Sequence, residues 1–205
     1  MYFWNDFYCM KRIFDIVCSL IILLLFFPFG LIISLLILLE SRGGIFYRQE
    51  RIGRYGKPFR LFKFRSMRKN ADKQGKLTVG MRDSRITRTG YFIRKFKLDE
   101  FPQFINVIAG DMSIVGPRPE VKEYVDLYTD EQRLILNVRP GITDLASLEY
   151  FEENELLGKA SDPQKTYIEE IMPAKIALNK RYLANPTLAN DLTIMWKTFV
   201  RIIKR

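Results

Sequence analysis

Residues 16–39, IVCSLIILLLFFPFGLIISLLILL, run for 24 positions without a charged side chain. An unbroken α-helix of this length measures about 36 Å, enough to cross the roughly 30 Å hydrocarbon core of a bilayer. Pro28 lies in the middle of the run, and Gly30 follows it. Because a proline inside a helix removes one backbone hydrogen bond and clashes with the preceding turn, the sequence predicts a membrane helix that kinks at Pro28.

Basic residues flank this segment on both sides. Lys11 and Arg12 precede it, and Arg42, Arg48 and Arg51 follow it. Since Lys and Arg beside a membrane segment favour the cytoplasmic side, both ends of the helix prefer the cytoplasm. A re-entrant helix that dips into the membrane and returns satisfies this preference, and a kinked helix that crosses once is the alternative. A signal peptide fits poorly, because the apolar run is too long and no small-residue cleavage site follows it.

A second apolar pattern lies near the end of the sequence. Six residues recur at helical spacing: Leu188, Leu192, Met195, Trp196, Phe199 and Ile203. Basic side chains surround this stripe, which is typical of a helix lying in the membrane interface. An amphipathic helix that packs its apolar face on the core would show the same pattern.

The charge of the chain is concentrated in one segment. Residues 41–98 hold 18 Lys and Arg and three acidic residues, so their net charge is 18 − 3 = +15. Such a segment is expected to face phosphate groups, anionic lipid or nucleic acid. A membrane-tethered nucleic-acid-binding module is therefore one hypothesis, although no helix-turn-helix, RRM or zinc-finger motif supports it.

The chain contains no histidine, which excludes a Ser-His-Asp triad, a Cys-His pair and a His-ligated zinc site. Its two cysteines, Cys9 and Cys18, lack metal-binding spacing, and reduced thiols are consistent with a cytoplasmic main domain. Any catalysis must then use carboxylates, Lys, Tyr, Ser or Thr, with or without a hard metal ion bound by oxygen atoms.

The soluble part is predicted to be mostly helical, with few strands. Phe59–Met67 is predicted as a strand, and Pro102–Ile108 and Tyr124–Val138 as helices. A further helix is expected to begin at Asp162-Pro163 and to continue to about residue 184, with a bend or split at Pro173. The predicted class is α+β with a small β element.

Asp99 and Glu100 are the main candidates for catalysis. Pro102 fits only the first turn of a helix, so it places the two acids where a helix begins. Free backbone N–H groups and the helix dipole favour an ionised carboxylate there. An ionised Asp99 could attack phosphorus, and Glu100 could hold Mg²⁺ beside it. An ordinary acidic N-cap would give the same pattern.

Three basic residues are candidates for binding phosphate. Arg118 lies between Pro117 and Pro119, which restrict the backbone and direct a bidentate guanidinium. Lys63 lies on the predicted strand, and Arg94 shortly precedes the acidic pair. A rigid turn with an exposed Arg is the alternative for Arg118, and solvated surface charge is the alternative for Lys63 and Arg94.

Several motifs occur in a fixed order along the chain: Lys11-Arg12-x-Phe14-Asp15, FYRQERIG (46–53), KFRSM (63–67), LDEFPQ (98–103), GDMSIVGPRP (110–119) and RPGIT (139–143). Together with the apolar run broken at Pro28, they resemble the bacterial sugar transferase family, the monotopic phosphoglycosyltransferases. The resemblance is close from residue 11 to about residue 145, and it rests on the combination of motifs.

The resemblance implies a re-entrant membrane helix in residues 1–40 and a cytoplasmic catalytic domain in residues 41–205, with membrane-interface helices, at the bacterial inner membrane. It implies that Asp99 attacks a UDP-sugar and forms a covalent phosphosugar intermediate, releasing UMP. Glu100, with Asp99, would bind Mg²⁺. Lys63, Arg94 and Arg118 match positions that contact phosphate or nucleotide.

The expected partners are a UDP-sugar, polyprenyl phosphate and inner-membrane lipid, with no nucleic acid, and a homodimer is compatible with the sequence. Polyprenyl phosphate would accept the sugar phosphate and so begin the assembly of a glycan. The family often has Ser before the membrane proline, where this chain has Phe27, and Gly where it has Asp144. These differences leave the kink geometry and the identity of the sugar open.

Overall fold

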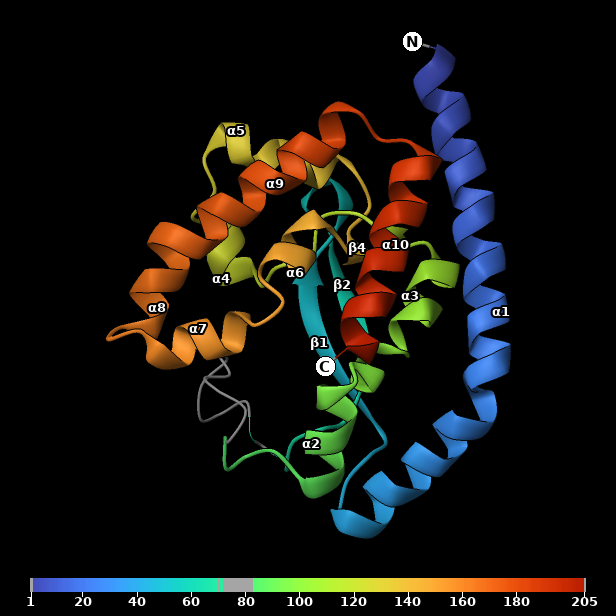
Figure 1. The fold of residues 1–205 in the computed structure, drawn as a ribbon, viewed down its shortest axis with the longest axis vertical. Coiled ribbons are helices and arrows are strands. Elements are labelled where there is room, and N and C mark those ends of the chain that lie inside the picture. Colours follow the sequence, from blue (N-terminus) through green and yellow to red (C-terminus); the bar gives the residue numbers. More distant parts are fainter. Residues whose placement is uncertain (1, 70, 72–82, 205) are drawn as a thin grey trace.

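The computed structural model describes residues 2–69, 71 and 83–204, which form a mostly helical chain with two small sheets (Figure 1). In chain order the elements are α1 (Tyr2–Glu40), β1 (Phe46–Ile52), η1 (Arg54–Gly56), β2 (Pro58–Phe64), α2 (Arg88–Lys95), η3 (Leu98–Glu100), α3 (Gln103–Ala109), β3 (Ser113–Val115), α4 (Lys122–Val125), α5 (Asp130–Arg133), η4 (Leu134–Asn137), β4 (Gly141–Thr143), α6 (Leu145–Glu149), α7 (Glu153–Lys159), α8 (Pro163–Thr166), η5 (Tyr167–Ile171), α9 (Met172–Ala184) and α10 (Leu188–Ile203). The predicted α+β class with a small β element is confirmed.

The long helix α1 contains Pro28 and changes direction in its second half (Figure 1). The Ser34 hydroxyl donates a hydrogen bond of 2.6 Å to the carbonyl of Gly30, just beyond the proline. A proline ring excludes the usual backbone bond one turn earlier, so a bend near this position is expected.

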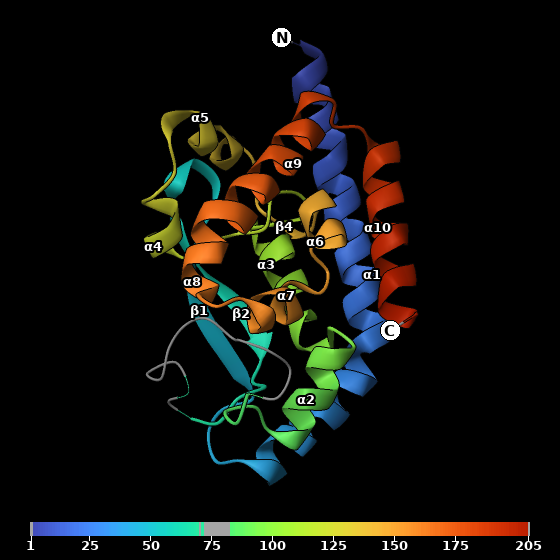
Figure 2. The ribbon, with the colours of Figure 1, turned by 60° about the vertical axis from the view of Figure 1, so that its left-hand side comes forward.

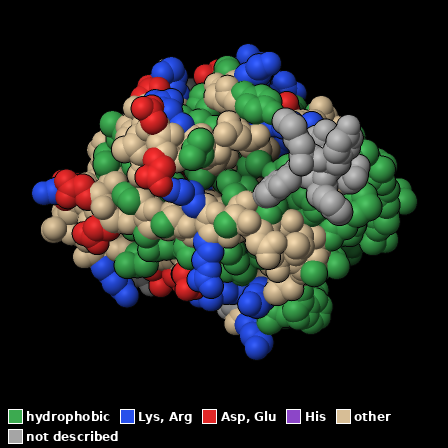
Figure 3. All heavy atoms as spheres, turned by 90° about the horizontal axis from the view of Figure 1, so that it is seen from above, with side chains coloured by type: hydrophobic (Ala, Val, Ile, Leu, Met, Phe, Trp, Pro, Cys, Tyr) green, Lys and Arg blue, Asp and Glu red, His purple; other side chains and the backbone are tan. Residues whose placement is uncertain are grey.

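Most apolar side chains of α1 face away from the rest of the protein. Among the described residues, Phe7–Glu40 is the one helical segment long and apolar enough to cross a membrane. Leu24 and Leu39 are 76% and 75% exposed. Viewed from the end at which the chain begins, hydrophobic side chains gather on the side where α1 lies, and charged side chains cover much of the remaining outline (Figure 3).

The opposite face of α1 packs on the soluble part. Ile33 and Ile37 are buried in one cluster with Phe64 of β2 and Ile93 of α2. The rings of Phe26 and Phe101 also stack, with 3.6 Å between their centroids. This packing fixes the second half of α1 beside the segment that carries the acidic pair.

A buried polar network holds the first half of α1. The Lys11 ammonium lies 2.5 Å from the Asp191 carboxylate of α10, and Tyr182 donates a hydrogen bond of 2.5 Å to the same carboxylate. Asp15 accepts a hydrogen bond of 2.6 Å from Ser113 of β3. These contacts place α1 and α10 side by side, as both ribbon views show (Figure 2).

The first sheet is the antiparallel hairpin β1–β2, closed by the turn η1. Tyr55 and Gly56 in this turn have φ values of 59° and 73°, a left-handed conformation that glycine adopts without strain. The predicted strand Phe59–Met67 corresponds to β2. The last residue of the predicted strand, Met67, lies beyond the end of β2 and forms an isolated bridge with Ile86.

The second sheet pairs β3 with β4 in parallel. The backbones approach so closely that a Cβ at Gly141 would lie 2.2 Å from the nitrogen of Gly116. Glycine is therefore required at this contact, which positions the loop carrying Arg118.

The helix predictions hold best where the caps are local. Gln103–Ala109 confirms the predicted helix over 102–108. Asp162 caps α8 as predicted, and the expected irregularity at Pro173 takes the form of the π-helical turn η5 before α9. The single helix predicted over Tyr124–Val138 is wrong. The capping box of Thr129 begins a new helix there, and the segment forms α4, α5 and η4.

The apolar stripe of α10 faces outward. Leu192, Trp196, Phe199 and Ile203 are exposed, whereas Asp191 and Ile194 are buried. Of the other two stripe residues, Leu188 is half-buried and Met195 packs against a buried cluster that includes Val107 and Ile194. The stripe is therefore mostly outward-facing, with one edge on the core.

Candidate active site

Asp99 and Glu100 lie in the 3-10 turn η3, which leads through Phe101 and Pro102 into α3. They are thus near the start of a helical stretch, as the sequence predicts, although the start is a 3-10 turn. Lys97, which precedes the turn, has the left-handed φ value of 56°. A non-glycine residue in this conformation stores strain, which is often found at functional sites.

The Asp99 side chain is almost completely enclosed, because the residue is only 7% exposed. Burial raises the pKa of the Asp99 carboxyl, while the positive charge of Lys63 opposes that shift. Within the described part of the chain, no side chain or backbone group forms a hydrogen bond or ion pair with this carboxylate. Its oxygen lone pairs therefore remain available for a reaction or for a metal ion.

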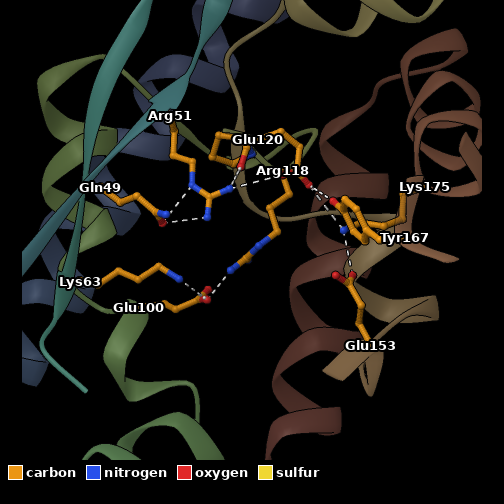
Figure 4. A network of polar contacts seen from close by, with 10 residues as sticks. Gln49, Arg51, Lys63, Glu100, Arg118, Glu120, Glu153, Tyr167 and Lys175 are labelled. Atoms are coloured by element: carbon orange, nitrogen blue, oxygen red, sulfur yellow. Dashed lines mark hydrogen bonds and ion pairs between the residues drawn. The ribbon is translucent and has the colours of Figure 1, made fainter. Parts of the chain in front are cut away.

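Glu100, in contrast, is held by two cations (Figure 4). Its carboxylate lies 3.1 Å from the Lys63 ammonium and accepts a short hydrogen bond from the Arg118 guanidinium. Burial raises the pKa of Glu100, but the charges of Arg118 and Lys63 outweigh burial and hold this pKa well below its usual range. Glu100 is therefore ionised at neutral pH.

The Arg118 side chain is aimed by its own loop. Its backbone N–H donates to the Asp144 carboxylate at 3.2 Å, and its guanidinium donates to the Ile142 carbonyl at 3.2 Å. The charge of Glu100 raises the pKa of Arg118. The two flanking prolines and these bonds direct the guanidinium at the acidic pair, so Arg118 is not a freely solvated turn residue.

Arg94 and Lys63 approach the pair in different ways. Lys63 extends from β2 and contacts Glu100 directly; its pKa is lowered by burial despite the opposing charge of Glu100. Arg94, in the last turn of α2, forms no ion pair with either acid. Its positive charge, like that of Lys63, opposes the rise that burial causes in the pKa of Asp99. The structure therefore gathers all five predicted site residues around one point, with Arg94 at the edge.

A second charged network beside Arg118 was not predicted (Figure 4). Glu120 accepts a hydrogen bond from Tyr167 and lies 3.4 Å from Arg51 and 3.8 Å from Lys175. Lys175 in turn lies 2.8 Å from Glu153. Burial raises the pKa of Tyr167, and the charge of Glu120 raises it further, so the hydroxyl stays protonated and donates.

Only part of this second network carries a sequence signal. Glu120 directly follows the two-proline loop, and Arg51 belongs to the motif at 46–53. Lys175 and Glu153 lie in helices without a recognisable motif, and only the folded chain shows that their charges are paired.

The capacity of the site for Mg²⁺ rests on two carboxylates. No group of three or more Cys, Asp or Glu side chains suited to a metal ion occurs in residues 2–69, 71 and 83–204. Mg²⁺ is nevertheless commonly bound by one or two carboxylates together with water and substrate phosphates. Asp99, which has no partner among the described residues, and Glu100 fit that mode.

Comparison with known proteins gives one consistent family. Residues 6–205 match the family model described as bacterial sugar transferase. The chain is 38% identical over 196 residues to the UDP-N-acetylgalactosamine-undecaprenyl-phosphate N-acetylgalactosaminephosphotransferase of Aeromonas hydrophila. That match covers 94% of this chain but 43% of the Aeromonas protein.

Two further relatives are shorter. The exopolysaccharide production protein ExoY of Rhizobium meliloti is 33% identical over 203 residues, which cover 92% of this chain and 83% of that protein. A putative undecaprenyl-phosphate N-acetylgalactosaminyl 1-phosphate transferase of Bacillus subtilis is 46% identical over 121 residues, covering 59% of this chain and 68% of the relative. The relatives therefore differ in length, and two of their names specify N-acetylgalactosamine while the third specifies no sugar.

Proposed function

Because the chain belongs to the bacterial sugar transferase family, we propose that it transfers a sugar 1-phosphate from a UDP-sugar to polyprenyl phosphate. Two of the relatives carry undecaprenyl phosphate in their names, which makes it the acceptor to test first. The observation that carries the proposal is the position of Asp99. It is an enclosed carboxylate without a hydrogen-bond or ion-pair partner among the described residues, and the charges of Lys63 and Arg94 act on it. The adjacent Glu100 is held by Arg118.

In this proposal Asp99 is the nucleophile. A carboxylate oxygen of Asp99 attacks the phosphorus that bears the sugar, and the bond from this phosphorus to the bridging oxygen breaks. UMP leaves with the bonding electron pair, and the sugar phosphate remains attached to Asp99. An oxygen of polyprenyl phosphate then attacks the same phosphorus, which forms the polyprenyl-diphosphate sugar and regenerates the carboxylate.

The cations offset the negative charges of the diphosphate and the attacking carboxylate, which this reaction brings together. A diphosphate repels an attacking carboxylate, and fixed guanidinium and ammonium groups reduce that repulsion in an enclosed site. Arg118 and Lys63 hold Glu100 in the ligand-free protein. We expect both to turn part of their hydrogen-bonding capacity to phosphate oxygens when the donor binds, with Arg94 contacting the donor from α2.

Mg²⁺ would be held by Asp99 and Glu100 together with the diphosphate. When bound, it would supply positive charge that neutralises the phosphates. The Asp99 carboxylate, whose pKa is raised by burial, would then be favoured in its ionised form, since added positive charge stabilises the anion.

The membrane provides the acceptor, and the exposed apolar surfaces support a location there. We propose that α1 enters the bacterial inner membrane and returns near Pro28, so that residues 41–205 lie on the cytoplasmic face. The outward stripe of α10 would lie in the interface beside it. This arrangement would bring the headgroup of a polyprenyl phosphate to the level of Asp99.

The test is UMP release by the full-length protein in nanodiscs with undecaprenyl phosphate and Mg²⁺, across a panel of UDP-sugars. We expect Asp99→Asn to reduce turnover by at least about 10³-fold, as removing a nucleophile does elsewhere. Asp126→Asn, an equal change at the exposed aspartate that follows α4, should leave turnover unchanged. Without acceptor, radiolabelled sugar phosphate should remain on the wild-type protein only. Near-normal turnover of Asp99→Asn would reject the nucleophile.

A further inference from the structure

A pocket at the other end of α1 gathers basic side chains away from the acidic pair. Its walls include Arg12 of α1, Arg54 of η1 and Arg139, which precedes β4, together with Lys11 and Asp15. Lys63, Asp99, Glu100 and Arg118 do not line it. The pocket is therefore distinct from the candidate active site.

The three arginines are held by backbone carbonyls rather than by acids. Arg12 donates to the carbonyls of Ile108 and Met112 at 3.2 and 3.3 Å. Arg139 donates to the Gly110 carbonyl at 2.9 Å, and Arg54 to the Asn137 carbonyl at 3.1 Å. The carbonyls that hold Arg12 and Arg139 lie near the end of α3, and the one that holds Arg54 lies at the end of η4. Such carbonyls orient a guanidinium but leave its full charge in place.

Arg54 and Arg139 each use only Nε in these hydrogen bonds. The Arg54 guanidinium also lies over the ring of Tyr55, 4.5 Å from its centroid, a contact that leaves its terminal N–H groups able to donate. Among the side chains of residues 7–69, 71, 83–153 and 155–204, no ion pair joins Arg12, Arg54 or Arg139 to a carboxylate. Of these side chains, the acid in the pocket wall is Asp15, which is hydrogen-bonded to Ser113 and lies 3.9 Å from Lys11. The donors that face the pocket therefore exceed the acceptors.

Like charges at this density oppose one another. Burial lowers the pKa of Arg139, and the charges of Arg12 and Arg54 lower it further. Partly buried cations are normally paired, because an unpaired charge away from water is costly. Several guanidinium groups that face one pocket without ion pairs to acids are suited to binding phosphate.

We propose that this pocket binds a phosphate group at Arg12, Arg54 and Arg139, as a second anion site separate from the reacting centre. The apolar part of its wall, Phe7, Val138, Leu183 and Pro186, would accept the glycerol or acyl portion of a phospholipid. The group can come from a membrane phospholipid or from free phosphate. Because the site is separate from Asp99 and its test measures binding, it stands or falls independently of the proposed transferase activity.

The experiment compares thermal unfolding of the full-length protein with and without the anion. In one arm, inorganic phosphate replaces chloride at constant ionic strength in neutral detergent. In the other, nanodiscs of phosphatidylcholine alone are compared with nanodiscs that also contain phosphatidylglycerol. At an anion concentration about tenfold above Kd, we expect the Tm of the wild type to rise by roughly 3–6 °C in at least one arm.

The double variant Arg54→Gln/Arg139→Gln should lose most of this rise. Arg60→Gln/Arg133→Gln, which removes the same charge from exposed positions, should keep it. Arg118→Gln should keep the part of the rise that Arg54→Gln/Arg139→Gln removes, which separates this pocket from the active site. A rise in the phosphate arm alone identifies free phosphate as the source, and a rise in the phosphatidylglycerol arm identifies lipid.

The proposal is overturned if neither anion raises the Tm of the wild type, or if Arg54→Gln/Arg139→Gln keeps the full rise. Equal loss in the exposed control pair also overturns it, since that result indicates non-specific attraction. If the double variant does not fold, the single variant Arg54→Gln is used. It removes one carbonyl bond from a half-buried residue and should still lose at least half of the rise.

Discussion

Glu100 and Arg118 are 18 positions apart in the chain, yet the carboxylate of the first accepts a hydrogen bond from the guanidinium of the second. Lys63 completes the contact from β2 at 3.1 Å. The acid next to the proposed nucleophile is thus fixed between two cations before any substrate is present. This arrangement lets the two cations act as a preformed receptor for phosphate.

Replacing Arg118 should mainly impair use of the nucleotide-sugar. In Arg118→Ala the bidentate donor is lost and Glu100 keeps only Lys63, so we expect KM for the UDP-sugar to rise by about tenfold or more. The measurement is UMP release over a range of donor concentrations. Arg48→Ala, at an exposed arginine of β1, is the matched control. Unchanged kinetics in Arg118→Ala would remove this residue from the site.

Replacing Lys63 should change the pH dependence of turnover. Burial already raises the pKa of Asp99, and the charge of Lys63 counteracts that rise. In Lys63→Met the pKa of Asp99 should therefore rise further, so a smaller fraction of Asp99 is ionised at a given pH. We expect the acid limb of kcat/KM to move to higher pH, measured at saturating Mg²⁺. An acid limb at the wild-type pH would show that Lys63 does not tune Asp99.

The exposed Lys57 provides the control for that comparison. Lys57→Met removes the same charge from the turn of the hairpin. Lys57 is not among the residues that contact Glu100. Its pH profile should superimpose on that of the wild type. A matching shift in both variants would indicate an effect of total charge alone.

The buried pair Lys11–Asp191 should contribute strongly to stability. Its side chains are 9% and 1% exposed, so Lys11→Met leaves a carboxylate without its partner in a closed environment. We expect a loss of about 3 kcal/mol in the free energy of unfolding. Lys122→Met breaks the exposed pair Lys122–Asp126, with side chains 69% and 53% exposed, and should cost less than about 0.5 kcal/mol.

Both variants are compared in one detergent by denaturant unfolding. Equal losses in the free energy of unfolding would mean that burial does not determine how much the Lys11–Asp191 pair contributes to stability. Restoring part of the stability with Lys11→Met/Asp191→Asn would support the unpaired charge as the cause, because that double variant removes both charges.

Local signals account for the parts of the fold that the sequence predicts. Asp162-Pro163 carries its own cap and helix start, and Pro28 and Pro173 act through the backbone of their own helices. The strand over residues 59–67 follows from alternation. The prediction of one helix over Tyr124–Val138 is wrong because Thr129 forms a capping box with Gln132, which begins a new helix inside this range.

The sequence predicts those residues of the candidate site that lie in motifs. Arg118 lies between two prolines that restrict the backbone, and Asp99 lies three positions before Pro102, which indicates a helix start. Lys175 and Glu153 are ordinary helix residues in sequence, and only tertiary packing pairs them across the fold. Arg12 and Arg139 belong to motifs, but only the fold shows that they and Arg54, from three separate segments, line one pocket.

The outward stripe of α10 should bind membranes. Trp196 is 65% exposed on that stripe, so Trp196→Glu places a charge where apolar contact with lipid is expected. We expect a smaller fraction of the protein to float with liposomes of phosphatidylcholine and phosphatidylglycerol after salt extraction. Thr193→Glu puts the same charge on an exposed polar position of the same helix and should float like the wild type. Equal loss in both variants would contradict a specific apolar face.

The re-entrant path of α1 predicts that both of its flanks are reached from the same side of the membrane. Cys9 is exposed before the apolar run, and Tyr55 is 61% exposed after it. Two single-cysteine proteins test this: Cys18→Ala keeps Cys9 alone, and Cys9→Ala/Cys18→Ala/Tyr55→Cys keeps one thiol beyond α1. With a membrane-impermeant maleimide, both should react in inverted inner-membrane vesicles and neither in intact spheroplasts. If Cys9 reacts in spheroplasts while position 55 is protected there, the two flanks of α1 lie on opposite sides of the membrane. That result would mean that α1 crosses the bilayer once, against the preference of its basic flanks for one side.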